Sequence, residues 1–93
     1  MTVKIFIKRS VTESTLEELT SLFHKMRGVC LIQPGYISGQ TLKRLDRPGE
    51  RLVISTWRSI EDWENWFKSS ERREIQLQID SLLGEETTYA IYR

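Results

Sequence analysis

Residues 36–57, with the sequence YISGQTLKRLDRPGERLVISTW, contain two strand-like stretches on either side of a turn. Tyr36–Leu45 and Leu52–Trp57 are rich in β-branched and aromatic residues, which favour strands. Between them, the DRPG run at residues 46–49 combines a proline that fixes φ with a glycine that adopts left-handed conformations. The segment therefore predicts a β-hairpin. Within its first strand, Gly39 predicts a bulge or a close backbone approach.

The residues before this hairpin predict a strand and then a helix. In residues 3–8, aliphatic side chains alternate with Lys4, Phe6 and Lys8, and this two-residue period is that of a strand. Ser14 and Glu17 have the spacing of a capping box, in which each side chain bonds a free amide at a helix start. Apolar residues then recur at helical spacing as far as Met26, and Gly28 is expected to end the helix. We expect this helix over about residues 14–27.

The residues after the hairpin predict two helices and a last strand. Ser59 is expected to cap a helix, and a second helix is expected over about residues 71–83, ended by Gly84. Residues 87–92 have the β-branched and aromatic composition of a strand. The stripe on the first of these helices is Ile60, Trp63, Trp66 and Phe67.

The resulting order is βαββαβ, the split arrangement of the α+β ferredoxin-like fold. It predicts one antiparallel sheet of four strands with the helices on one face. Both faces of Tyr36–Leu45 and of Thr87–Tyr92 carry large apolar side chains, so the second face of the sheet also needs a cover. No further helix is available in the chain. We therefore expect a homodimer in which two copies pack sheet to sheet.

Length and composition narrow the possible classes of protein. The 93 residues are enough for one domain, which we expect to span residues 1–93. With 14 Lys and Arg against 13 Asp and Glu, the net charge of +1 gives no signature of nucleic-acid or membrane binding. One cysteine, Cys30, and one histidine, His24, exclude an intramolecular disulfide and a multi-histidine metal site. The sequence shows no signal peptide or membrane span, so we expect a cytoplasmic protein.

A longer stretch, residues 33–75, carries a resemblance to a known family: QPGYISGQTLKRLDRPGERLVISTWRSIEDWENWFKSSERREI. Its features are a Pro-Gly-aromatic start of a strand, a hairpin, a strand ending in Trp-x-Ser, and an aromatic helix running into Ser-Ser. In these features it resembles the antibiotic biosynthesis monooxygenase (ABM) domain family. The resemblance follows the element order over about residues 3–92. It implies a dimeric α+β barrel, with a pocket in each subunit between the sheet and the helices.

The resemblance also implies a range of functions. Some members of that superfamily oxygenate phenols or quinols without metal or flavin, others degrade haem, and others have no known activity. An electron-rich phenolate itself passes an electron to dioxygen, so such a protein needs only to bind, deprotonate and desolvate its substrate. Our hypothesis is a cofactor-independent monooxygenase, using no metal, for a small aromatic or quinol-type metabolite. The alternative is a non-catalytic ligand-binding or interaction module on the same fold.

Haem degradation is disfavoured by the residues themselves. The run NWFKS at residues 65–69 resembles the haem-degrading branch, whose motif tryptophan falls on Trp66. The haem-ligating histidine of that branch falls on Gln76, and its asparagine falls on about Lys8. Glutamine is a poor iron ligand. We therefore expect no haem chemistry by that mechanism.

The candidate substrate-pocket residues are aromatic: Trp66, Phe67, Tyr36 and Tyr89. Trp66 is placed at the pocket by the family resemblance, whereas Trp63 is expected to serve mainly the core. On spacing alone most such helical stripes are core packing, which stays the alternative for Trp66 and Phe67. Ordinary packing within the sheet is the alternative for Tyr36 and Tyr89.

No catalytic residue is identified from the sequence. His24 lies about 150° around its helix from the Leu19–Met26 stripe, so we expect a solvated surface residue rather than a base. Cys30 lies in an apolar run and is expected to be a small buried hydrophobe. No nucleophile–base pair follows from the spacing, and the general base stays unassigned.

Overall fold

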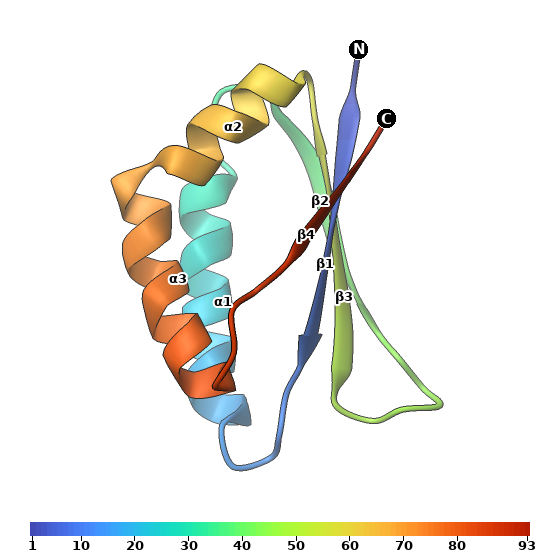
Figure 1. Ribbon diagram of the computed structural model, residues 1–93, viewed down its shortest axis with the longest axis vertical. Coiled ribbons are helices and arrows are strands. Elements are labelled where there is room, and N and C mark those ends of the chain that lie inside the picture. The colour runs from blue at the N-terminus through green and yellow to red at the C-terminus, as the bar shows by residue number, and fades with distance from the viewer.

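The computed structural model describes all 93 residues and has the predicted order of elements. The elements are β1 (Val3–Ser10), α1 (Leu16–Cys30), β2 (Tyr36–Lys43), β3 (Glu50–Trp57), α2 (Ile60–Lys68), α3 (Ser70–Leu83) and β4 (Tyr89–Tyr92). The strands form one antiparallel sheet in the order β2-β3-β1-β4. All three helices cover the same face of the sheet (Figure 1). The α+β ferredoxin-like fold is therefore confirmed. None of the helices combines the length and the apolar character needed to cross a membrane.

Helix α1 departs from the prediction at both ends. Its N-cap is Thr15, and no side chain caps it; the Ser14 hydroxyl instead lies 3.1 Å from that of Thr12. The predicted capping box is therefore wrong. Gly28 lies inside the last turn rather than after it, because Val29 and Cys30 pack against the core and hold the helix through this position. Their packing outweighs the cost of about 1 kcal/mol for a helical glycine.

Two serines cap the N-termini of α2 and α3. The Ser59 hydroxyl accepts a hydrogen bond from the amide of Asp62 at 3.2 Å, which confirms the predicted cap. Ser69 ends α2 in an extended conformation, and its hydroxyl accepts a bond from the amide of Arg72 at 3.3 Å. The chain therefore changes direction between two helices without a longer loop. Gly84 ends α3, as predicted.

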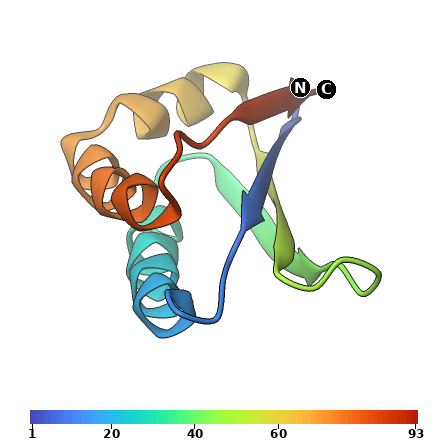
Figure 2. The same cartoon turned by 60° about the horizontal axis from the view of Figure 1, so that its bottom comes forward.

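The hairpin of β2 and β3 is confirmed, with two differences in detail. Gly49 has a φ of 97°, the left-handed conformation expected of the turn. β2 ends at Lys43, two residues earlier than predicted, and residues 44–49 form the projecting loop seen in Figure 2. The bulge lies between Tyr36 and Ser38 rather than at Gly39. Gly39 does permit a close approach, but by a side chain: the Tyr36 hydroxyl occupies the space that a Cβ atom would need.

The core lies between the sheet and the helices and has two parts. One cluster joins the sheet to α2, and its buried members are Val3, Ile5, Trp57, Trp63 and Trp66. The other lies mainly between α1 and α3, and its buried members are Val11, Leu19, Ile75 and Ile79. The first cluster anchors α2 on β3, and the second joins α1 to α3.

The strand register defines what each face of the sheet carries. On β1, Val3, Ile5 and Ile7 face the helices, while Phe6 lies on the opposite face and pairs with Ile54 of β3. That outer face also carries four further apolar side chains, which are Leu42, Leu52, Ala90 and Tyr92. The helices of this chain leave this second apolar face uncovered.

The two faces of the helical layer predict opposite results for two leucine substitutions. Leu19 of α1 is completely buried, whereas Leu77 of α3 is 72% exposed. Leu19→Ala is expected to lower the free energy of unfolding by about 2–5 kcal/mol because it leaves a cavity in the core. Leu77→Ala, the matched control in a helix, should change it by less than about 0.5 kcal/mol. Urea unfolding at one protein concentration measures both, and equal losses would contradict this helix packing.

Candidate functional site

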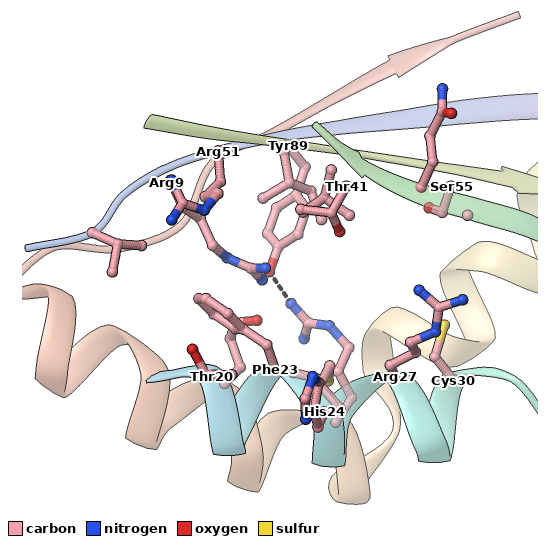
Figure 3. Close-up of a pocket in the computed structure, with 18 of the residues that line it drawn as sticks. Arg9, Thr20, Phe23, His24, Arg27, Cys30, Thr41, Arg51, Ser55 and Tyr89 are labelled. Atoms are coloured by element: carbon pink, nitrogen blue, oxygen red, sulfur yellow. Dashed lines mark hydrogen bonds between the residues drawn. The ribbon is translucent and has the colours of Figure 1, made fainter. Parts of the chain in front are cut away.

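A cavity of about 540 Å³ lies between the inner face of the sheet and the helices, as Figure 3 shows. Its volume is within the range of roughly 300–1,000 Å³ that is typical of sites for small ligands. All seven helices and strands contribute to its lining. Its exposed lining residues lie on α1 and on the edge strand β2, so the mouth is between these two elements.

One end of the cavity has an aromatic wall. Trp63 and Trp66 of α2 line it and are only 8% and 7% exposed. Trp66 stacks on Trp57 with ring centroids 6.4 Å apart, and Tyr36 meets Trp57 edge-on at 5.4 Å. These contacts fix the rings, because each is held from behind by another aromatic group. This end of the cavity is therefore a rigid apolar surface.

Arg72 of α3 links the aromatic wall to β4. It is 6% exposed, donates a hydrogen bond to the carbonyl oxygen of Phe67 at 2.9 Å, and donates another to the hydroxyl of Tyr89. Its guanidinium also lies over the Phe67 ring, 4.2 Å from the centroid. Burial raises the pKa of Tyr89, while the charge of Arg72 acts in the opposite direction. The tyrosine therefore stays a neutral hydrogen-bonding group at neutral pH.

The other end of the cavity is cationic. Arg9, Arg51 and Lys43 come from β1, β3 and β2, and all three line the cavity. In the register, Arg9 lies opposite Arg51, and Arg51 lies opposite Lys43. Arg27 and Arg72 line other parts of the cavity, and no Asp or Glu lines any part of it. The site is therefore strongly positive, although the chain as a whole is nearly neutral.

One wall of the cavity comes from α1, whose contributing residues include Thr20, Phe23, His24, Arg27 and Cys30 (Figure 3). His24 is exposed, as predicted, but it also lies on the mouth of the cavity. Because α1 packs mainly on α3 rather than on the sheet, residues of α1 outside its core stripe also line the cavity.

Cys30 is half-buried and lines the same wall. Burial raises the pKa of its thiol to about 12, and the nearby charge of Arg27 only partly opposes this effect. Because the thiolate is the nucleophilic form, this cysteine is unreactive at neutral pH. It serves as a small packing residue.

Three of the four residues expected at a substrate pocket come together in the structure. Tyr36, Trp66 and Tyr89 line the cavity, whereas Phe67 does not and instead packs behind it against Arg72 and Tyr89. Trp63 was expected to serve mainly the core. It belongs to the core cluster but lines the cavity as well, so the structure does not separate the roles of the two tryptophans.

The residues present do not fit the haem site of the related branch. Gln76 lines the cavity, but its side-chain amide donates hydrogen bonds to Asp80 at 2.8 Å and Thr87 at 2.9 Å. Lys8 pairs with Leu52 and lies on the outer face of the sheet, away from the cavity. Nor does any group of three His, Cys, Asp or Glu side chains come together that could hold a metal ion.

The sequence reasoning missed the cationic end of the cavity. The signal was present, because the alternation that places Val3, Ile5 and Ile7 on the inner face places Arg9 there too. Arg51 then follows from the register of the hairpin against β1. Arg72 had a weaker signal, since its burial depends on the sharp turn at Ser69. A place in the first turn of a helix is usually exposed to solvent, but Arg72 is buried.

The fold and the cavity define an α+β domain of ferredoxin-like topology with a cavity between its sheet and its helices. The sequence model of the antibiotic biosynthesis monooxygenase family matches residues 2–77. This chain belongs to that family.

Other comparisons agree on the fold. A conserved protein from Methanosarcina mazei Go1 superposes with a TM-score of 0.90 at 20% identity, covering 100% of this chain and 92% of that one. SnoaB, a cofactor-independent oxygenase from Streptomyces nogalater, superposes with a TM-score of 0.86 at 14% identity, covering 99% and 91%. Protein SchA from Streptomyces halstedii is 26% identical over 73 residues, which cover 78% of this chain but only 19% of SchA. The match therefore spans about a fifth of that relative.

The pairing of Arg72 with Tyr89 predicts a loss of stability in Tyr89→Phe. The variant leaves a buried guanidinium with one partner fewer, which should lower the free energy of unfolding by about 1–3 kcal/mol. Tyr92→Phe, which keeps the ring on the outer face and removes only a hydroxyl on the same strand, is the control and should change it by less than about 0.5 kcal/mol. Urea unfolding at neutral pH measures both.

The same variant should alter the alkaline limb of the stability profile. Because burial raises the pKa of Tyr89 above its ordinary value of 10.0, the unfolded chain loses this proton first as the pH rises. Stability therefore falls above about pH 10, and it should fall less steeply in Tyr89→Phe. Identical slopes in wild type and variant would contradict the burial of this hydroxyl.

Proposed function

We propose that this protein is a cofactor-independent monooxygenase that acts on a small hydroxylated aromatic or quinol-type metabolite. The observation that carries the proposal is a cavity that combines fixed aromatic rings with cations and no carboxylate. Aromatic walls suit a flat apolar ligand, and nearby cations favour the ionised form of a phenol. Membership of the ABM family supports the same class of reaction. In this proposal Trp66, Tyr36 and Tyr89 contact the bound ring, while Phe67 positions Arg72.

The reaction requires only the phenolate and dioxygen. The phenolate passes an electron to dioxygen, and the resulting superoxide joins the ring carbon opposite the hydroxyl. The new C–O bond is kept, the ring C–H proton is lost, and the O–O bond breaks to release the second oxygen as water. The product is a quinone. The substrate loses four electrons and dioxygen gains four, so no external reductant is needed. The protein binds the phenolate and excludes bulk water.

The proton of the substrate hydroxyl needs an acceptor in the cavity. Burial raises the pKa of Cys30 to about 12 and raises those of Tyr36 and Tyr89, so none of these groups is a base at neutral pH. No carboxylate lines the cavity. His24 is the remaining candidate, and imidazole is the most common general base in enzymes. Its place at the mouth lets the proton pass on to solvent.

The test uses 1,5-dihydroxynaphthalene under labelled ¹⁸O₂. The expected product is 5-hydroxy-1,4-naphthoquinone that carries one ¹⁸O atom, with the second atom in water, as measured by mass spectrometry. His24→Gln should lower the rate roughly 100-fold, in the range lost with a general base, while ligand binding persists. Arg73→Met, at an exposed residue, is the control. Product without label, or a rate equal to that of heat-denatured protein, would overturn the proposal.

A second function, ligand binding without turnover, is supported by one observation. The only candidate base lies at the solvent-exposed mouth, and the deeper lining provides none. In that case aromatic ligands bind tightly and leave oxygen consumption at the background rate. The labelling experiment, combined with a titration of the same ligand, distinguishes the two functions.

We also propose that the protein works as a homodimer through the outer face of the sheet. This face carries Phe6 and Tyr92, whose rings meet edge-on at 4.8 Å, and beside them Leu42, Leu52 and Ile54. Leu42 is 46% exposed and Tyr92 is 57% exposed, so the face holds apolar area that a monomer leaves in water. Contiguous exposed apolar surface of this kind marks protein interfaces.

Light scattering coupled to size exclusion tests the dimer. We expect a dimer at micromolar concentration, with a buried area above roughly 2,000 Å² in total. Leu42→Asp should convert it to a monomer, because a charge would enter the apolar interface. Leu77→Asp, at the exposed leucine of α3, should leave the dimer intact. A monomeric wild-type protein would contradict the proposal.

A further inference from the structure

The cationic end of the cavity has an arrangement that the fold alone does not need. Lys43, Arg51 and Arg9 stand side by side on three adjacent strands, all directed at the same space. Like charges directly opposite one another on a sheet destabilise it. No carboxylate lies within ion-pair distance of any of the three. The ion pairs of the chain are made by other arginines. A negatively charged group from outside the chain would therefore stabilise this row of cations.

Arg9 gives an independent indication of the same kind. Its side chain is 8% exposed, and its Nε is the one buried side-chain nitrogen or oxygen without a hydrogen-bond partner. The guanidinium lies over the ring of Phe23 at 4.7 Å, which holds it at the cavity wall. A buried donor without a partner is costly unless a ligand or water satisfies it. The natural partner of a guanidinium fork is an oxyanion, which accepts two parallel hydrogen bonds.

The aromatic and cationic ends lie at a defined separation along the strands. Ser55 of β3 lines the cavity near the aromatic end, and Arg51, four residues away, lies at the cationic end. At a rise of about 3.3 Å per residue, these positions are roughly 13 Å apart. Tyr89 and Val53 line the stretch between them. The cavity therefore accommodates an elongated ligand with an apolar body and a charged end.

We propose that the ligand of this cavity is an aromatic carboxylate, whose rings lie against Trp63 and Trp66 and whose carboxylate binds at Arg9 and Arg51. This inference rests on the proposed function for the identity of the site and adds the class of substrate. The carboxylate orients the ring system along the cavity, so that the reacting hydroxyl is held at a fixed distance from the anchor. Lys43, at the exposed end of the row, contributes charge at the mouth.

Calorimetric titration without oxygen tests this directly, because binding is then measured apart from turnover. The probe is 1-hydroxy-2-naphthoate, and its matched neutral analogue is 1-hydroxy-2-naphthamide. We expect the carboxylate to bind at least 10-fold more tightly than the amide, and we expect this advantage to shrink as salt is added. Equal affinities would overturn the inference. Tighter binding of 1-naphthyl phosphate than of the carboxylate would overturn the assignment of the anion as a carboxylate.

Variants locate the anchor. Arg9→Met keeps an unbranched apolar side chain in place of the aliphatic part of arginine and removes the charged guanidinium, so it should weaken binding of the carboxylate roughly 10- to 100-fold and leave the amide unchanged. Arg51→Met should do the same and serves as the second variant if Arg9→Met fails to fold. Arg73→Met, an exposed arginine of α3, should change neither affinity. An unchanged carboxylate affinity in both variants would place the anion elsewhere and overturn the proposal.

A stability measurement separates a binding role from a structural one. Because Arg9 faces Arg51 and has no ion-pair partner, Arg9→Met should unfold at the same urea concentration as wild type or at a higher one when no ligand is present. A lower midpoint would indicate that Arg9 supports the fold, and would count against the inference.

The outcomes for this inference and for the proposed function are distinguishable. Tight binding of the carboxylate without labelled product overturns the oxygenase and keeps the anion site. Labelled product together with equal affinity for carboxylate and amide overturns the anion site and keeps the oxygenase.

Discussion

The stacking of Trp66 on Trp57 is the contact on which the rest of the structure depends. It anchors the helical layer to the sheet at one end, where α2 lies on β3. From there the chain turns at Ser69 into α3, which packs on α1. Helix α1 packs mainly on α3, and its C-terminal part also packs against the cluster that contains these tryptophans. The layer is closed at the tryptophan end and stands away from the strands at the other, which creates the cavity.

This geometry explains why much of the fold follows from sequence and the site only in part. The hairpin and the Ser59 cap depend on local chemistry, so the turn residues and the capping serine were sufficient to predict them. The end of α1 does not depend on local chemistry. Gly28 would favour a helix end, but Val29 and Cys30 pack against the core and extend the helix past it. Similarly, the aromatic wall was visible in the stripe of α2. Predicting the cationic end required the register of β1 against β3, which brings together residues far apart in the chain.

The inner face of the sheet changes character along its length. Near the start of β1 it carries Val3 and Ile5, which are buried in the core, and at the end of the strand it carries Arg9. Burial, followed by the charge of Arg72, lowers the pKa of Arg9, while Tyr89 and Asp80 act against this effect. A guanidinium stays charged even so, since its ordinary pKa is far above neutral. One strand therefore contributes to the core at its beginning and to the cationic end of the cavity at its end.

The hairpin tip has a consequence for the electrostatic field at the cavity mouth. Arg44 binds Asp46 at 2.7 Å and Glu50 at 3.2 Å, and Arg47 adds a contact to Glu50. The carboxylates closest in sequence to Lys43 and Arg51 are thus neutralised within the loop itself. The electrostatic field at the cavity mouth therefore comes mainly from the unpaired cations. Such a field accelerates the encounter with negatively charged molecules and repels positive ones, an effect that acts on the association rate before any contact forms.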